Sequence, residues 1–212
     1  MLVDGSVVTN PASRVGPDAS IALSRRTPLK GESKLEPALA GFHVPVEGRV
    51  ALDVGAAAGG FTAVLLRHGA RRVYAVDAGF GQLVGSLRQD PRVVNLERTN
   101  LADLDRGLVP DPIDLLTLDL SFLSLTDAVP QLQRLQLHAS ADMVALVKPM
   151  FELRLPEPPG DLRLQRALDV AVAGIEDAGW RVIASMRSPV LGSRGAQEFL
   201  VHARLTNAAE AR

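Results

Sequence analysis

From residue 50 onward, short apolar runs rich in β-branched residues alternate with stretches of helical spacing. Because parallel strands need a crossover connection, usually a helix, this order predicts an α/β fold built on a mostly parallel, doubly wound sheet. The expected strands are 50–54, 72–77, 92–96, 113–119 and 143–148. The expected helices are 61–68, 82–88, 125–137 and 162–178.

The last part of the chain holds two strand patterns in succession, 181–187 and 198–205, with a turn around 189–195 between them. Two consecutive closing strands predict an antiparallel hairpin at the sheet edge, which brings the sheet to seven strands.

The first 31 residues have a different character. Short strands are expected at Leu2–Val3, at Val7–Val8 after a D-G turn, and at Ile21–Leu23. A segment this short buries no core of its own, so we expect an appendage. Residues 14–34 carry five basic and two acidic side chains, a local charge of +3. A solvated linker explains this charge, and a phosphate-contacting arm is the functional alternative.

Composition excludes several classes of protein. There is no cysteine, which rules out disulfide scaffolds and thiolate chemistry. The four histidines are scattered, so no metal site is expected. The formal charge is −1, which argues against wholesale coating of nucleic acid. The longest apolar runs, such as 143–147, are too short to span a membrane, and the start lacks a signal-peptide pattern, so a cytoplasmic protein is expected.

The most informative stretch is V-A-L-D-V-G-A-A-A-G-G-F-T at 50–62. A buried strand carries Asp53, and Gly55, Gly59 and Gly60 then lead into a helix at Phe61. Glycines there allow a tight turn and close approach to a ligand, and the helix start offers free N–H groups.

A second strand ends in Asp77, where a carboxylate is placed to accept hydrogen bonds from both hydroxyls of a ribose. The turn lacks G-x-G-x-x-G spacing, so no nicotinamide site is indicated. A capping aspartate and the glycine turns of a generic α/β fold are the alternative reading.

Five motifs extend this pattern: D-V-G-A-A-A-G-G-F-T, V-Y-A-V-D-A-G-F-G-Q-L, D-P-R-V-V-N-L-E-R-T-N, L-D-L-S-F-L-S-L and A-L-V-K-P-M-F-E. Together they resemble the TlyA (hemolysin A-like) family of S-adenosylmethionine-dependent ribosomal RNA 2′-O-ribose methyltransferases, relatives of the FtsJ group. The resemblance covers residues 30–155 and 180–205. It implies a Rossmann-like methyltransferase domain over 32–207, followed by a disordered tail at 208–212.

The resemblance also implies the roles of cofactor-binding residues. Gly55, Gly59 and Gly60 would flank the methionine part of S-adenosylmethionine, and Asp77 would hold its ribose. Asn100 would lie near the adenine, and Asp119 beside the methyl group. Asp53 and Phe61, within the first motif, complete the expected cofactor-binding set.

The family's catalytic set of two lysines and two carboxylates is implied at Lys34, Asp119, Lys148 and Glu198. A ribose hydroxyl is a poor nucleophile, and its proton must leave as the methyl group transfers in line. Lys148 is the expected base, and Asp119 is expected to orient it. Lys34 and Glu198 are expected to position the hydroxyl. For each residue, a plain surface charge is the alternative.

Three departures from the family bear on the substrate. The family begins with a complete RNA-binding module of the ribosomal-protein S-four type, whereas residues 1–31 resemble only its latter half, as a truncated remnant and linker. Glu32 puts an acid where a phosphate approaches. After the V-K-P motif, three prolines within 156–159 replace a glycine-rich basic loop, and the lost N–H donors argue against a phosphate cradle.

Three hypotheses follow. The first is methyl transfer to a ribose 2′-hydroxyl of ribosomal RNA, with the ribosomal RNA or a ribosomal subunit as partner. The second keeps S-adenosylmethionine but replaces the RNA with a small-molecule secondary metabolite. The third is a catalytically idle binding protein, which the presence of all four charged residues opposes. No long basic amphipathic segment with aromatics is present, so no membrane partner is expected.

Overall fold

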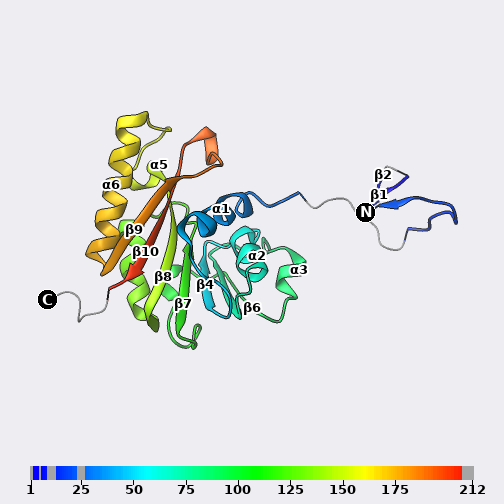
Figure 1. Ribbon diagram of the computed structural model, residues 1–212, viewed down its shortest axis with the longest axis horizontal. Helices are drawn as coiled ribbons and strands as arrows, with labels where there is room; N and C mark the ends of the chain where they lie inside the picture. Colours follow the sequence, from blue (N-terminus) through cyan, green and yellow to red (C-terminus); the bar gives the residue numbers. More distant parts are fainter. Residues whose placement is uncertain (1, 5, 9–12, 23–26, 207–212) are drawn as a thin grey trace.

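A computed structural model describes residues 2–4, 6–8, 13–22 and 27–206. Its main body is a seven-stranded sheet in the order β6-β5-β4-β7-β8-β10-β9, flanked by helices (Figure 1). The strands of this sheet are β4 (Val50–Val54), β5 (Arg72–Asp77), β6 (Val93–Glu97), β7 (Ile113–Leu118), β8 (Leu137–Val147), β9 (Trp180–Arg187) and β10 (Phe199–Leu205).

Strands β6, β5, β4, β7 and β8 are parallel to one another, whereas β10 runs antiparallel between β8 and β9. The predicted doubly wound sheet with an antiparallel edge hairpin is therefore confirmed. Because β10 lies next to β8, the chain segment just before β10 is brought to the carboxyl end of β8.

The helices are shorter than the sequence pattern predicted in two places. The predicted helix 82–88 is α3 (Gly85–Arg88), and the predicted helix 125–137 is α4 (Leu125–Ala128) followed by a 3₁₀ turn, η2 (Val129–Arg134). Pro130 lies at the start of η2 and has no N–H to continue an α-helical ladder. The other helical segments are α1 (Glu32–Phe42), α2 (Gly60–Arg67), η1 (Leu101–Asp103), α5 (Pro149–Glu152), α6 (Asp161–Asp177) and η3 (Ser193–Gly195).

Strand β8 begins at Leu137, earlier than the predicted residue 143. Its first residues, including His138 and Ser140, are exposed, and only the part from Ala141 onward is buried. A prediction based on an apolar run detects only this buried part.

The core has two layers, one on each face of the sheet. On one face α4 and α6 cover β7 and β8, with Leu116, Met143 and Ile175 fully buried. On the other face α1 and α2 pack together, because a Cβ on Gly60 would lie 2.8 Å from the Cα of Gly31 and none is present. The two helix starts therefore touch beside the end of β4.

A buried polar network joins β8 to the antiparallel strand β10. Asp142 on β8 is fully buried and accepts hydrogen bonds from Arg49 (2.7 Å) and Arg204 (3.1 Å), and it lies 2.8 Å from Nε2 of His202. Hydrogen bonds from these partners hold the pKa of Asp142 below its usual range, against the opposing effect of burial. The network explains how a charge is tolerated between two central strands.

The N-terminal segment forms a separate three-stranded antiparallel sheet in the order β2-β1-β3, which lies apart from the main sheet in Figure 1. Its strands are β1 (Leu2–Val3), β2 (Ser6–Val7) and β3 (Ile21–Ala22). The second strand begins one residue before the predicted Val7. Leu23 and the predicted tail at 208–212 lie outside the described residues.

Candidate active site

A cavity of about 720 Å³ opens at the carboxyl ends of β4, β5 and β7. Its walls include Gly55, Asp77, Asn100 and Asp119. A smaller cavity of about 210 Å³ adjoins it, since both share Gly55, Ala57 and Asp119. Ligands of open α/β sheets bind in this position, because loops diverge there and leave a crevice.

The turn after β4 requires glycine at its first position. Gly55 has φ +85°, and a Cβ there would lie 2.4 Å from the backbone oxygen of Asp119. The loops after β4 and β7 can therefore approach only because residue 55 has no side chain. This contact brings Asp119 to the boundary between the two cavities.

Six of the eight predicted cofactor-binding residues line one or both cavities, and two do not. Gly55, Asp77, Asn100 and Asp119 line the large cavity, and Gly60 and Phe61 line the small one. Two others line neither cavity. Gly59 is the N-cap of α2 at φ +92°, and the space its Cβ would need is filled by Leu83 and Leu87.

Asp53 is the other residue that the structure places away from both cavities. Its side chain is fully buried and accepts hydrogen bonds from the hydroxyls of Thr62 (2.6 Å) and Thr117 (3.0 Å). Burial raises the pKa of Asp53 to about 6, although the two hydroxyls oppose the shift. The carboxylate therefore ties β4 to α2 and β7 beneath the glycine turn.

Asp77 fixes the backbone at the edge of the large cavity through two hydrogen bonds. One carboxylate oxygen accepts the N–H of Ala57 at 2.8 Å, and the other accepts the N–H of Gly79 at 2.6 Å. Each carboxylate oxygen has a second lone pair, so the group retains acceptor capacity toward a ligand in the cavity.

Four charged side chains from distant parts of the chain form one connected row, with Asp119 between two lysines. Lys148 Nζ lies 2.7 Å from Asp119 Oδ1, and Lys34 Nζ lies 3.9 Å from Asp119 Oδ2. Lys34 Nζ also donates to Glu198 Oε2 at 2.7 Å. The order Glu198–Lys34–Asp119–Lys148 is thus a continuous row of alternating charge. It combines residues from α1, from the loop after β7, from the position just after β8 and from the position just before β10.

The two ends of this row differ in how far their side chains are buried. The side chains of Lys34 and Glu198 are only 6% and 5% exposed, whereas those of Asp119 and Lys148 are 22% and 15% exposed. The Lys34–Glu198 end is therefore enclosed, and the Lys148 end faces the open side. A Cβ on Gly192 would lie 2.1 Å from Glu198 Oε1, so the carboxylate packs directly on glycine backbone.

Two neighbours of Lys148 were not identified from the sequence. Ser121 accepts a hydrogen bond from Lys148 Nζ at 3.1 Å. Phe122 is 91% exposed, has φ +68°, and its ring lies 5.4 Å from the ring of Phe151. Both residues lie in the quoted L-D-L-S-F-L-S-L motif, but their roles depend on contacts with another segment.

Glu32 does not present a free acid to a ligand, contrary to the expectation from the sequence. It is buried, its Oε2 pairs with Arg67 at 3.0 Å, and its Oε1 accepts the N–H of Leu29 at 3.0 Å. The acid that departs from the family pattern is therefore balanced within the protein.

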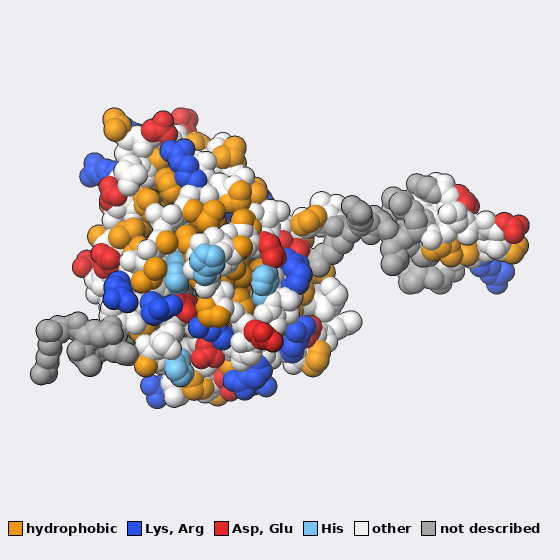
Figure 2. Space-filling model, in the orientation of Figure 1, with side chains coloured by type: hydrophobic (Ala, Val, Ile, Leu, Met, Phe, Trp, Pro, Cys, Tyr) orange, Lys and Arg blue, Asp and Glu red, His pale blue; other side chains and the backbone are white. Residues whose placement is uncertain are grey.

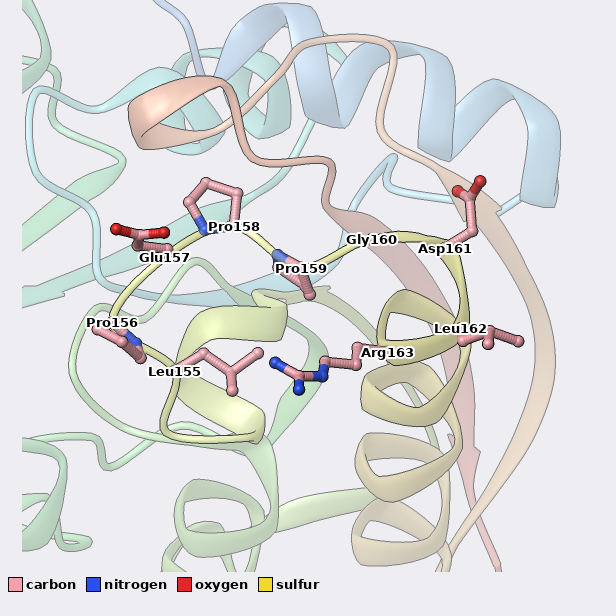
Figure 3. Close-up of a pocket in the computed structure, with 9 residues that line it drawn as sticks. All are labelled: Leu155, Pro156, Glu157, Pro158, Pro159, Gly160, Asp161, Leu162 and Arg163. Carbon is pink, nitrogen blue, oxygen red and sulfur yellow. The ribbon is translucent and has the colours of Figure 1, made fainter.

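The proline-rich segment borders a cavity of about 480 Å³, formed by residues 155–163 (Figure 3). Arg194 donates to the backbone oxygen of Pro156 at 2.8 Å, and Figure 3 shows Arg163 directed toward Leu155. Prolines at 156, 158 and 159 offer no N–H donors to a ligand in this cavity.

Charge is mixed on the visible face of the molecule. On the face shown in Figure 2, acidic and basic side chains are intermingled rather than separated by sign. Within the described part of the chain, no cluster of three or more His, Cys, Asp or Glu residues is arranged to hold a metal ion. No helix in these same residues combines the length and apolar character needed to cross a membrane.

Comparison with known proteins identifies the family. Residues 30–205 match the model of the FtsJ-like methyltransferase family. The chain belongs to the FtsJ-like methyltransferase family. The predicted methyltransferase fold and enzyme class are confirmed by this match.

Individual FtsJ-like relatives are also similar over most of the chain. The 16S/23S rRNA (cytidine-2′-O)-methyltransferase TlyA of Mycobacterium tuberculosis is 40% identical over 94% of this chain and 78% of its own length. Hemolysin A of Brachyspira hyodysenteriae is 34% identical over 95% of this chain and 88% of its own. A hemolysin-like protein of Streptococcus thermophilus has a TM-score of 0.81 at 36% identity, covering 88% of this chain and 70% of its own.

The raised pKa of Asp53 predicts a pH dependence of stability. The native carboxyl binds its proton up to about pH 6, whereas an unfolded one releases it near pH 4. Stability therefore falls as pH rises through this window, because the native state then buries a charge. In Asp53→Asn this fall should be smaller by on the order of 1–3 kcal/mol, while the part that is due to Glu152 remains. Urea unfolding from pH 4 to 7 measures it, and an equal slope in both proteins would contradict the assignment.

The contact between Gly192 and Glu198 predicts the effect of one added methyl group. In Gly192→Ala the Cβ displaces the Glu198 carboxylate and weakens its pair with Lys34, so the free energy of unfolding should fall by about 1–3 kcal/mol. Gly85→Ala is the control, because a Cβ there meets nothing within 4 Å. Urea unfolding of both variants checks this, and equal stabilities would show that the carboxylate has room to move.

Proposed function

We propose that this protein transfers a methyl group from S-adenosylmethionine to a ribose 2′-hydroxyl of ribosomal RNA. The observation that carries the proposal is the row Glu198–Lys34–Asp119–Lys148, in which Asp119 lines the large cavity and Lys34 the small one. The names of the curated relatives, which include rRNA (cytidine-2′-O)-methyltransferases, support ribosomal RNA over a small-molecule substrate.

The cavity residues suit a nucleoside-bearing cofactor. A volume of about 720 Å³ is within the usual range for such ligands. Asp77 offers a carboxylate to the ribose hydroxyls, and Asn100, Leu101 and Ala102 provide an amide and apolar contacts for the adenine. The turn at Gly55 would lie along the methionine part. When bound, S-adenosylmethionine supplies a methyl group on a positively charged sulfur.

The four charged residues would then divide the work of proton removal and positioning. Lys148 is the base that takes the proton from the substrate hydroxyl, because its Nζ lies on the open side of the row. Asp119 holds Lys148 at 2.7 Å and Ser121 adds a second contact at 3.1 Å. Lys34, held by Glu198, positions the hydroxyl from the enclosed side. Such positioning lowers the barrier by fixing the line of attack.

The exposed ring of Phe122 supports an RNA substrate. Phe122 lines the large cavity, three residues after Asp119, and its side chain is 91% exposed to solvent. Aromatic side chains stack on unpaired nucleobases, and this contact orients a nucleotide whose ribose must reach the base.

The proposal extends to organisation and location. We propose that residues 32–207 are the methyltransferase unit, and that residues 1–31 correspond to the latter half of an RNA-binding module of the S-four type with a linker. With ribosomal RNA as the substrate, we propose a cytoplasmic location for this protein.

Cofactor binding is tested at Asp77. Asp77→Ala removes the carboxylate that would hold the ribose, so the affinity for S-adenosylmethionine should fall about 10-fold or more in calorimetry, in line with the loss of charged hydrogen bonds. Asp90→Ala, which removes a carboxylate paired with Arg92 at the surface, is the control and should bind normally. Unchanged affinity in Asp77→Ala would remove the cofactor assignment.

Methyl transfer is tested at Lys148 with ribosomal subunits from a host that lacks the gene. Lys148→Ala should reduce transfer about 10²-fold or more, as expected for a lost general base. Lys148→Arg should fail similarly, since arginine keeps the charge but does not give up its proton at working pH. If subunits receive no label while a metabolite does, the small-molecule alternative is correct.

A further inference from the structure

The loop after β7 and the short helix after β8 contact each other at three points in register. Lys148 donates to Ser121, the ring of Phe151 lies against that of Phe122, and Glu152 accepts from Leu125. Segment 121–125 therefore lies alongside segment 148–152, and the row of charges borders both.

Glu152 makes the last of these contacts. Its Oε1 accepts the N–H of Leu125 at 2.9 Å. Leu125 is the first residue of α4, so its amide has no partner within the helix. Ser124 caps a second amide of the same turn, that of Asp127, at 3.1 Å. The start of α4 is thus held from within by Ser124 and from the neighbouring segment by Glu152.

The backbone of Glu152 is in turn bound to Lys148. The amides of Phe151 and Glu152 both donate to the carbonyl of Lys148, at 2.9 and 3.1 Å. A closed path therefore runs from the Lys148 backbone through Glu152 to Leu125, and back through Ser121 to the Lys148 ammonium group. Movement at one contact of this path is passed to the others.

The backbone conformation of Phe122 depends on contacts made by the neighbouring residues. A bulky residue at φ +68° is strained, and strain persists only where surrounding contacts impose it. Because the ring is 91% exposed, burial of its own side chain contributes little to holding it. The contacts on either side, at Ser121 and Leu125, must therefore fix the backbone of this loop.

We propose that Glu152 is a positioning residue for methyl transfer: through Leu125 it holds Ser121 and Phe122 in the arrangement that orients Lys148 and the substrate nucleotide. This inference rests on the proposed function. Glu152 contacts none of the four charged residues through its carboxylate, so it acts through the loop.

The surroundings of Glu152 indicate that its role depends on a hydrogen-bond acceptor for the Leu125 amide rather than on the negative charge of the carboxylate. Its other oxygen, Oε2, is buried without a hydrogen-bond partner among the described residues, and no lysine or arginine of that part of the chain forms an ion pair with it. Burial, together with the nearby charge of Asp127, raises the pKa of Glu152 to about 7. A neutral side chain with an oxygen in the same place should therefore serve as well.

The test compares four variants of the full chain, after purification with normal S-adenosylmethionine binding as the check on folding. Glu152→Ala should lower kcat for transfer to ribosomal subunits about 10- to 100-fold, with cofactor affinity within threefold of wild type. Glu152→Gln keeps the oxygen and should stay within about fivefold. Glu152→Asp keeps the charge but withdraws the oxygen, and should resemble Glu152→Ala. Glu157→Ala, at an exposed acid in the next loop, is the control.

Hydrogen exchange of the Leu125 amide gives a readout that does not depend on activity. Exchange should accelerate in the Ala and Asp variants and stay slow in the Gln variant, because only the latter retains the acceptor. If Ala does not fold, the comparison of Asp with Gln carries the test. Wild-type kcat in Glu152→Asp, or equal loss in Gln and Asp, overturns the inference. An inactive wild type with the predicted exchange pattern instead overturns the proposed function, and with it the role in methyl transfer, while the contact of Glu152 with Leu125 stands.

Discussion

Asp119 shares its two carboxylate oxygens between two ammonium groups, and the site depends on this arrangement. Lys148 lies 2.7 Å from one oxygen and Lys34 lies 3.9 Å from the other. Two lysines in one enclosed space repel each other unless carboxylates separate them, and burial strengthens both effects. Glu198, behind Lys34, completes the balance. The alternating order therefore allows two cationic side chains to reach the same substrate position.

Close backbone contacts within the fold hold the four charged side chains in this alternating arrangement. The Asp119 loop can approach the turn after β4 because Gly55 lacks a side chain, and Glu198 can reach Lys34 because Gly192 leaves space beside it. The placement of β10 next to β8 brings Glu198 and Lys148 to the same end of the sheet. A charged row assembled from four segments is thus held by close backbone contacts, in which one methyl group changes the geometry.

Much of this molecule follows from local patterns. Apolar runs alternating with helical stretches predicted the sheet and its edge hairpin, because strands buried on both faces of a sheet have continuous apolar sequences. The ends of elements were less accurate: β8 starts with exposed residues that no apolar pattern marks, and Pro130 interrupts the helix predicted over 125–137. The residues of the charged row were found through motif resemblance, since charge patterns alone also fit a solvated surface.

The sequence by itself determined which chemistry-bearing residues are present and in which motif each stands, because residue identity and motif spacing are properties of the chain. Only the tertiary structure decided how they are used. Asp53 belongs to the same motif as Gly55, yet packing turns its carboxylate to Thr62 and Thr117 and away from the cavities. Glu152 gains its partner, Leu125, only when the segments after β7 and β8 lie side by side. Such contacts join residues far apart in the chain, so local sequence carries no signal for them.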